Sequence, residues 1–433
     1  MQLTKLLQDA EIANCPELAV SDWENYTHND NEIKINSKLF DRKMIFDGLT
    51  EEGAPAEAIE SLLSTADMIE KHTALNEFTK LLAYSLTYIF RRWSYAFDGP
   101  IEPGVLGDNK SSYMLLMFYA ALPYRKAKLV ERGVPEEVLA NAVKAAFTTP
   151  VRVYDQVGTW AFNDLPWQTN FMMLDIFLLD RLYFVLDKLD APIAAYRNKS
   201  DPKKVKALYT GGHRFRADGQ LSGANGIDAD EKGFTSIFEE TADAYIGNFI
   251  APMGYVEKDP VKLLKSDWEP VLTESDWVMT IHMPGGEGYT LPRFKACCER
   301  AFAIFTNSYK DCDIKGFACD SWLFDGVLQF MMPAETSNIV QIQRQVYIYP
   351  QCRDDEMMRS IVFSLGNNTP WPPISELPKE TSLQRKAIAF MEKGGKFKAQ
   401  GMFLLSDDLP RFGENTYFDQ TYFEEFSRRY GVE

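Results

Sequence analysis

Strand-like and helix-like segments alternate along the last third of this 433-residue chain, and the alternation limits the folds open to it. Short apolar runs typical of strands are followed by longer segments with apolar residues at helical spacing. Such a pattern favours a mixed sheet packed against helices, an α/β (α+β) fold in largely three layers. The expected strands are residues 277–283, 314–319, 339–349 and 397–405, and the expected helices are residues 291–309, 324–331, 354–363 and 382–392.

The first 150 residues predict a helical region instead. Residues 74–97 are apolar on all sides, which is typical of a buried helix. The stretch Thr148-Thr149-Pro150 indicates a boundary, because proline interrupts a helix. The helices expected in this region are residues 53–70, 74–97, 112–122 and 135–147.

The patterns are mixed in the middle of the chain. A long apolar segment, 167–189, predicts a helix, and the prolines of residues 250–272 predict an irregular connection. A stretch rich in Gly and Asp, 211–226, predicts a loop, and short strands are expected at residues 151–157, 194–196 and 207–209. We therefore divide the chain into a helical N-terminal region (1–150), a mixed α/β segment (151–270) and a C-terminal domain (271–433).

The chain is acidic, with a formal net charge of −16. Nucleic acids and anionic membranes both attract clustered Lys and Arg, so we expect neither as a partner. Residues 1–10 lack the apolar stretch of a signal peptide, and no window approaches the ~18 uninterrupted apolar residues of a membrane span. A cytoplasmic location is the simplest expectation, and the sequence does not predict the oligomeric state.

The six cysteines show no pairing pattern. None forms a CxxC pair, and no zinc-ligand spacing is present. Together with the expected cytoplasmic location, this predicts reduced thiols, no disulfide and no bound metal. The cysteines are Cys15, Cys297, Cys298, Cys312, Cys319 and Cys352.

Four sequence blocks carry a family resemblance. They are WVMTIHMP (277–284), FACDSWLF (317–324), SNIVQIQRQVY (337–347) and LPKETSLQRKAIAFMEKGG (377–395). In this order they resemble the GNAT-like C-terminal domain of a bacterial acyltransferase family, over roughly residues 271–405. Upstream, residues 167–189 and 209–218 resemble the acyltransferase-associated N-terminal domain of that family.

The resemblance implies a GNAT-like acyl-CoA N-acyltransferase fold and a matching activity. An acyl group would pass from acyl-CoA to an amine or hydroxyl of a small-molecule acceptor, with acyl-CoA or acetyl-CoA as co-substrate and no metal. Residues 277–283, 284–288 and 291–309 match the GNAT order of central strand, loop and helix. A second possibility places the central strand at residues 339–349.

The loop of this unit would hold CoA. Gly285, Gly286 and Gly288 would let the backbone amides and the helix N-terminus approach the diphosphate closely. The usual GNAT fingerprint (Gln or Arg, two residues, Gly, one residue, then Gly or Ala) is absent, and Glu287 adds a negative charge. Arg344, expected in mid-strand, is a further candidate for binding a carboxylate or phosphate, with an ion pair as the alternative.

Candidate catalytic residues lie at or directly after the ends of two of the expected strands. His282, one of four histidines, precedes the glycine loop, where a side chain with a pKa near neutrality could deprotonate an attacking amine. Asp320 or Ser321 could orient the substrate or donate to the leaving thiolate, and Cys319 could be a nucleophile with His282 as its base. The structural alternatives are a histidine bonded to nearby backbone and a helix-capping turn at residues 319–322.

Two other cationic sites and two other functions stay open. Arg385 could bind an anion, and so could the run GGHRFRAD at 211–218, although a surface ion pair and an exposed turn are the respective alternatives. A catalytically degenerate GNAT fold that binds a ligand or a protein is the first rival to the acyltransferase, because the fingerprint is absent. A hydrolase built on Cys319 and His282 is the second.

Overall fold

The computed structural model describes residues 2–15, 17–28, 38–89, 96–223, 230–286, 288–351, 358–366 and 370–430. The chain forms two units. The first comprises Met1–Leu179 with Tyr183–Val185 and Asn307–Tyr309, and the second comprises Asp180–Leu182, Leu186–Thr306 and Lys310–Glu433.

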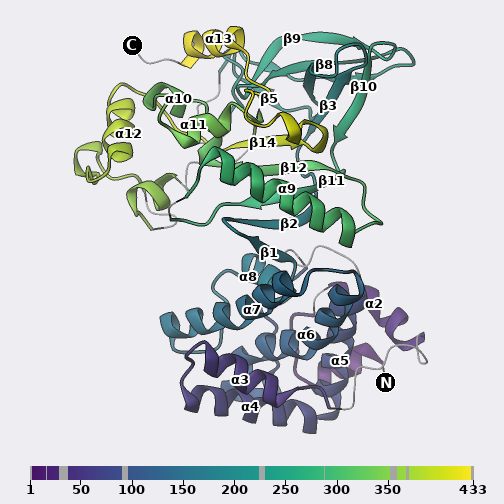
Figure 1. Ribbon diagram of the computed structural model, residues 1–433. Helices are drawn as coiled ribbons and strands as arrows, with labels where there is room; N and C mark the ends of the chain where they lie inside the picture. The colour runs from purple at the N-terminus through teal and green to yellow at the C-terminus, as the bar shows by residue number, and fades with distance from the viewer. Residues whose placement is uncertain are drawn as a thin grey trace. The chain divides into compact units, whose positions relative to one another are not determined.

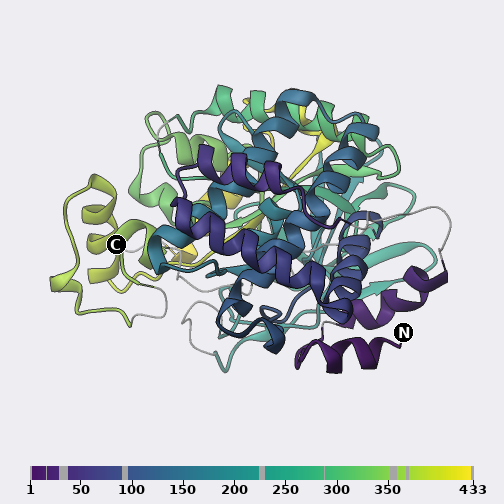
Figure 2. The same cartoon turned by 90° about the horizontal axis from the view of Figure 1, so that it is seen from below.

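The first unit is a set of packed helices, shown from two directions in Figures 1 and 2. Helix α5 is buried along most of its length, as its apolar sequence predicts. The elements are α1 (Leu3–Asp9), α2 (Glu17–His28), α3 (Arg42–Glu51), α4 (Ala56–Lys71), α5 (Thr73–Tyr88), η2 (Gly104–Ser112), α6 (Tyr113–Glu131), α7 (Glu136–Val157), α8 (Leu165–Met172) and the strand β1 (Ile176–Leu179).

Two local predictions for this unit are wrong. Helix α5 ends at Tyr88 rather than continuing to residue 97. Helix α7 continues through Pro150, so residues 151–157 are helical and not a strand. Proline in a helix costs about 3 kcal/mol, and the buried apolar side chains Phe147, Val151 and Val153 on the same helix offset that cost. The three-domain division of the sequence stays a prediction.

The predicted helix at residues 167–189 is also wrong. Helix α8 ends at Met172, and the apolar residues that follow form β1 and then β2 (Leu182–Lys188). Asp180 adopts a left-handed backbone, with φ 60°, in the turn between the two strands. Aspartate tolerates this conformation better than most residues, because its short side chain bonds locally.

The first sheet of the second unit contains, in spatial order, β2, β11 (Trp277–His282), β12 (Ile314–Ser321), β14 (Gln400–Leu405) and β13 (Tyr347–Pro350). Strands β11 and β12 are parallel, whereas β14 is antiparallel to both β12 and β13. Helix α9 (Leu291–Ser308) connects β11 to β12 and lies across this sheet in Figure 1. The predicted mixed sheet is therefore confirmed.

A second sheet includes the short strands predicted at residues 194–196 and 207–209, and it also takes in residues 250–272, which were predicted to be irregular. Its order is β10 (Trp268–Thr273), β3 (Ile193–Asn198), β4 (Val205–Tyr209), β8 (Ala244–Ala251) and β7 (Phe238–Glu240), and β9 (Tyr255–Leu264) also pairs with β8. Pro270 lies in β10, at the end of this order and beside a register shift. Edge strands and bulges tolerate proline, so the prolines did not prevent strand formation.

Shorter elements complete the second unit. Residues 339–349 are not one strand: α11 (Asn338–Gln343) comes first, and β13 follows. Ile339, Ile342 and Val346 are three and four residues apart, which is helical spacing. The other elements are β5 (Arg214–Phe215), β6 (Phe234–Thr235), η4 (Trp322–Phe324), α10 (Leu328–Met331), η5 (Met358–Val362), η6 (Ile374–Glu376), α12 (Ser382–Glu392), η7 (Ser406–Arg411) and α13 (Gln420–Tyr430). Within the described ranges, no helix is both long and apolar enough to span a membrane.

Candidate active site

The carboxyl ends of three parallel strands meet at one edge of the first sheet. Strand β12 runs parallel to β11, and β13 has the same direction because both β12 and β13 are antiparallel to β14. The three strands end at His282, Ser321 and Pro350. In open α/β sheets, this edge is the usual place for a ligand.

His282 and Asp320 lie at the same level of adjacent strands. The register pairs Thr280 with Ala318, and two further residues along each strand bring His282 opposite Asp320. Neighbouring residues at one level of a sheet point to the same face. Both side chains are partly exposed. The sheet therefore brings together two of the residues predicted for catalysis, although their roles stay predictions.

Cys319 points the other way. It lies level with Ile281, one residue before the His282–Asp320 level, so its side chain belongs to the opposite face. Cys319 is buried, and its thiol lies near Tyr289. This arrangement does not support a Cys319–His282 pair, because the two side chains leave the sheet in opposite directions.

Ser321 serves as a helix cap. Its buried hydroxyl accepts a hydrogen bond from the backbone N–H of Leu323, at 3.2 Å, and so begins the short helix η4. This is the capping role that the sequence offered as the structural alternative. The cap positions Trp322 and Leu323, which contact the adjoining cavity.

Gln351 is a site residue that sequence reasoning missed. Its side-chain amide donates to Oδ1 of Asp320 at 3.1 Å. Gln351 directly follows β13, so the contact joins residues 31 positions apart. No sequence signal indicated it, because a contact between residues 31 positions apart is set by tertiary packing.

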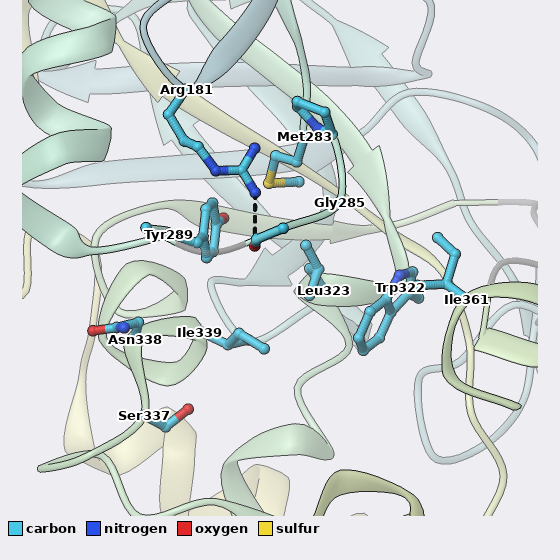
Figure 3. A pocket seen from close by; sticks show the side chains of 13 residues that line it. Arg181, Met283, Gly285, Tyr289, Trp322, Leu323, Ser337, Asn338, Ile339 and Ile361 are labelled. Atoms are coloured by element: carbon cyan, nitrogen blue, oxygen red, sulfur yellow. Dashed lines mark hydrogen bonds between the residues drawn. The ribbon is translucent and has the colours of Figure 1, made fainter. Parts of the chain in front are cut away.

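A cavity of about 610 Å³ opens beside this edge (Figure 3). Met283, the residue after His282, lines this cavity, and so does Trp322, the residue after Ser321. The size is typical of small-molecule sites, as is the mostly apolar lining. Besides the loop glycines, the described lining residues are Arg181, Met283, Pro284, Tyr289, Trp322, Leu323, Ser337, Asn338, Ile339 and Ile361.

The predicted glycine loop forms part of this wall. Gly285, Gly286 and Gly288 all line the cavity, and Glu287 lies outside the described residues. Gly286 has φ 111°, a value that residues with a side chain rarely adopt, and a Cβ atom there would enter open space. The loop thus exposes backbone to the cavity and leads directly towards α9.

The turn between β1 and β2 supplies a cation to the same wall. The Nη2 of Arg181 donates to the carbonyl oxygen of Gly286 at 3.0 Å. Next to it, both carboxylate oxygens of Asp180 accept from the guanidinium of Arg293, each at 2.6 Å. Sequence reasoning missed Arg181, because the turn was hidden within an apolar segment that was interpreted as a helix.

Tyr289 contributes a protonated phenol. Burial raises the pKa of Tyr289 well above its usual value, and the neighbouring Cys319 and Cys298 thiols raise it further. The phenol therefore keeps its proton at neutral pH and can donate a hydrogen bond to a ligand.

The other predicted cationic sites lie elsewhere. Arg344 is not in mid-strand but at the C-terminal end of α11, where its guanidinium covers the Phe418 ring at 4.3 Å. Arg385 donates to the backbone carbonyls of Lys379 and Glu380. His213 bonds to the hydroxyl of Tyr209 at 2.8 Å. Among the described residues that line the cavity, none of these three appears.

No metal cluster accompanies the site. Within the described ranges, no group of three or more His, Cys, Asp or Glu side chains could hold a metal ion. The cysteines described there, Cys15, Cys297, Cys298, Cys312 and Cys319, form no disulfide with one another.

The family comparison agrees with this arrangement of strand, glycine loop and helix. The model of the GNAT-like C-terminal domain matches residues 176–403, more than half of the chain. The chain belongs to this GNAT-like family. The match begins well before residue 271, so it includes all strands of the second sheet. The resemblance of earlier residues to an acyltransferase-associated N-terminal domain stays a prediction.

Solved structures share the fold. An acyltransferase in complex with decanoyl-CoA has a TM-score of 0.54 at 14% identity, covering 93% of this chain and 99% of its own. A mutant acyltransferase in complex with octanoyl-CoA has a TM-score of 0.51 at 15% identity, covering 94% and 99%. A complex with decanoyl-CoA and teicoplanin has a TM-score of 0.49 at 17% identity, covering 83% and 87%. Among curated proteins, no match to this GNAT-like chain was found.

Proposed function

We propose that this GNAT-like protein transfers an acyl group from acyl-CoA to an amine or hydroxyl of a small-molecule acceptor. One observation carries the proposal: the glycine loop, the cavity and the His282–Asp320 level all lie at the carboxyl ends of β11 and β12. Two acyltransferases that share the fold hold acyl-CoA. A bacterial source and a cytoplasmic location remain expectations from the sequence.

The described residues fit such a donor. The open backbone of Gly285 and Gly286, followed by the N-terminus of α9, suits the diphosphate of CoA. Apolar side chains, among them Met283, Trp322 and Ile339, suit the pantetheine arm and the acyl chain. The cavity thus offers a polar wall and an apolar wall, as a donor with both characters requires.

The proposed chemistry is a direct transfer. His282 would take a proton from the acceptor amine, whose nitrogen attacks the thioester carbon. The carbon–sulfur bond then breaks, and the protonated His282 would return its proton to the leaving thiolate. Asp320, held by Gln351, would orient His282 or the acceptor. Backbone N–H groups at the strand edge would stabilise charge on the carbonyl oxygen.

Calorimetry and a turnover assay test the proposal together. The protein should bind CoA, acetyl-CoA and decanoyl-CoA with micromolar or tighter Kd, and should release free thiol from an acyl-CoA when a suitable amine is added. Binding without thiol release across a broad acceptor panel would favour the degenerate, binding-only alternative. Absence of binding to every CoA compound would overturn the proposal.

A further inference from the structure

We propose that Gln343 is a positioning residue for acyl-chain selection, a role that rests on the proposed function. Gln343 ends α11, and the first turn of that helix lines the cavity. Its side chain bonds to η4, which supplies Trp322 and Leu323 to the same lining. By fixing the distance between these two apolar walls, Gln343 determines how closely the cavity holds an acyl chain.

The side-chain amide of Gln343 joins the two elements. Its Nε2 donates to the carbonyl oxygens of Leu323 at 2.7 Å and of Asp325 at 3.0 Å. The side chain is buried, and within the described ranges its Oε1 has no hydrogen-bond partner. An unpaired buried oxygen costs free energy that an apolar residue of the same size avoids. The two donated bonds are therefore what this amide contributes.

The backbone that Gln343 contacts is itself anchored. The N–H of Leu323 donates to the hydroxyl of Ser321, so both peptide groups of Leu323 are held by side chains. Asp325, which directly follows η4, is fully buried, and its carboxylate accepts from the backbone N–H of Lys398 at 2.8 Å. Gln343 thus connects α11 to an element that is fixed at both ends.

The other end of the connection lies in the cavity. Ile339 is four residues before Gln343, so the two side chains lie on the same face of α11. Ile339 and Leu323 both line the cavity, and in the view of Figure 3 Leu323 lies between Ile339 and Trp322. The Gln343 bonds therefore fix the spacing between Ile339 and the side chains of η4.

This part of the lining suits a hydrocarbon. Trp322, Leu323 and Ile339 are apolar, and Ile361 adds an apolar side chain that is 58% exposed and that a bound chain can cover. The amides of pantetheine need hydrogen-bond partners, whereas an acyl chain needs only apolar contact. A gap of about 0.5–1 Å already removes about a quarter to a half of the attraction between two apolar atoms. The spacing of the two walls therefore governs how much affinity an acyl chain adds.

The test measures by calorimetry the ratio of the Kd for CoA to the Kd for decanoyl-CoA, which requires no acceptor. In the wild type this ratio should be at least about 10, because a held chain removes apolar surface from water. Gln343→Met nearly keeps the volume but removes both donors; it should lower the ratio at least about fivefold and change the Kd for CoA less than about twofold. Gln343→Asn shortens the side chain and should give an intermediate ratio.

Gln345→Met is the matched control. The buried side chain of Gln345 bonds to Gln341, Gly413, Asn415 and Thr416, none of which is among the described lining residues. This variant loses buried hydrogen bonds close to Gln343 and should lower the Tm. The ratio should stay at the wild-type value, because the bonds of Gln345 do not join α11 to η4.

Each other outcome overturns the inference. Equal affinity of the wild type for CoA and decanoyl-CoA, or an unchanged ratio in a folded Gln343→Met, would do so and leave the proposed function intact. A lower ratio in Gln345→Met as well would show that the ratio follows stability. Equal losses for CoA and decanoyl-CoA in Gln343→Met would exclude the acyl chain as the group held.

A second variant keeps the test decisive if Gln343→Met does not fold. A wild-type ratio in Gln343→Asn would then overturn the inference, and a lowered ratio would support it. If the wild type binds no CoA compound, the proposed function is overturned as well.

Discussion

His282 lies level with Asp320 on the neighbouring strand. Substitution of His282 tests whether this histidine acts as a base or only supports the fold. His282→Ala should lower kcat about 10²- to 10⁴-fold, the usual contribution of a positioned base, and leave the Tm unchanged. The measurement is steady-state thiol release beside thermal unfolding. A histidine that only supports the fold would instead lower stability by about 1–3 kcal/mol, with activity lost in proportion to unfolding.

Gln351 offers a milder test of the same pair. Gln351→Ala removes the hydrogen bond to Oδ1 of Asp320 and should reduce kcat less than Asp320→Asn does. If the amide orients Asp320, the pH–rate profile of Gln351→Ala should shift, whereas KM for the donor should stay constant. An unchanged profile in both variants would exclude Asp320 from the proton transfers.

Asp408 predicts a pH-dependent contribution to stability. Burial alone would raise the pKa of Asp408, but hydrogen bonds from Arg197, Tyr417 and Arg411 outweigh it, and the pKa is lowered. A carboxyl with a lowered folded pKa stabilises the fold above its unfolded pKa, near 4, and loses that effect as pH falls through the folded value. Asp408→Asn should cost about 3–5 kcal/mol at pH 7.

Urea unfolding at pH 7 and pH 3 measures this effect. The difference in unfolding free energy between the wild type and Asp408→Asn should be smaller at pH 3, because the carboxyl of the unfolded chain, with a pKa near 4, is then mostly protonated and this favours the unfolded state. Asp313→Asn is a matched control, since Asp313 is 82% exposed and pairs only across the surface with Lys315; its cost should stay within about 1 kcal/mol at either pH. A larger difference in unfolding free energy at pH 3 than at pH 7 would contradict a lowered pKa for Asp408.

The sequence indicated some of these residues and not others. His282 and Asp320 were predicted because each follows a recognisable strand, and strand ends are where ligands bind. Arg181 and Gln351 could not be predicted, because each depends on a neighbouring element that was misassigned. A side chain's partner 31 or 105 positions away is set by tertiary packing, which local patterns do not encode.

Among the elements, α13 carries one fully buried ring. Phe426 is fully buried and contacts the rings of Phe330, Tyr255 and Tyr430. Phe426→Ala should lower the free energy of unfolding by about 3–5 kcal/mol, the usual cost of removing a buried aromatic ring. Urea denaturation checks the value, and the exposed Thr421→Ala on the same helix should change it by less than about 0.5 kcal/mol.

Elements were predictable where pattern and length agreed. Helix α12 matches its predicted bounds, since a capping box at Thr381 and Gln384 starts it and an amphipathic face fills it. The helix predicted at residues 167–189 was wrong because this segment is mostly apolar. In such a segment, periodicity does not distinguish a buried helix from buried strands. Proline was a misleading signal for helices and for strands. Pro150 lies inside a helix, and Pro260 lies inside a strand.

For the whole molecule, thiol chemistry gives a simple test. In denaturant without reductant, an aromatic disulfide reagent should titrate all six cysteines. In the native state Cys15 and Cys312, which are partly exposed, should react before the buried Cys297, Cys298 and Cys319. Burial raises the pKa of the Cys297 and Cys298 thiols and slows them further. Fewer than six titrated thiols would reveal a disulfide.

The ion pair between Asp180 and Arg293 indicates when the cavity is completed during synthesis. Its partners lie 113 positions apart, and the described cavity lining extends from Arg181 to Ile361. A chain emerging from the ribosome can close the local contacts of its early helices long before these segments exist. The cavity is therefore completed late in synthesis, and a chain truncated before residue 361 would hold the early helices but lack part of the cavity lining.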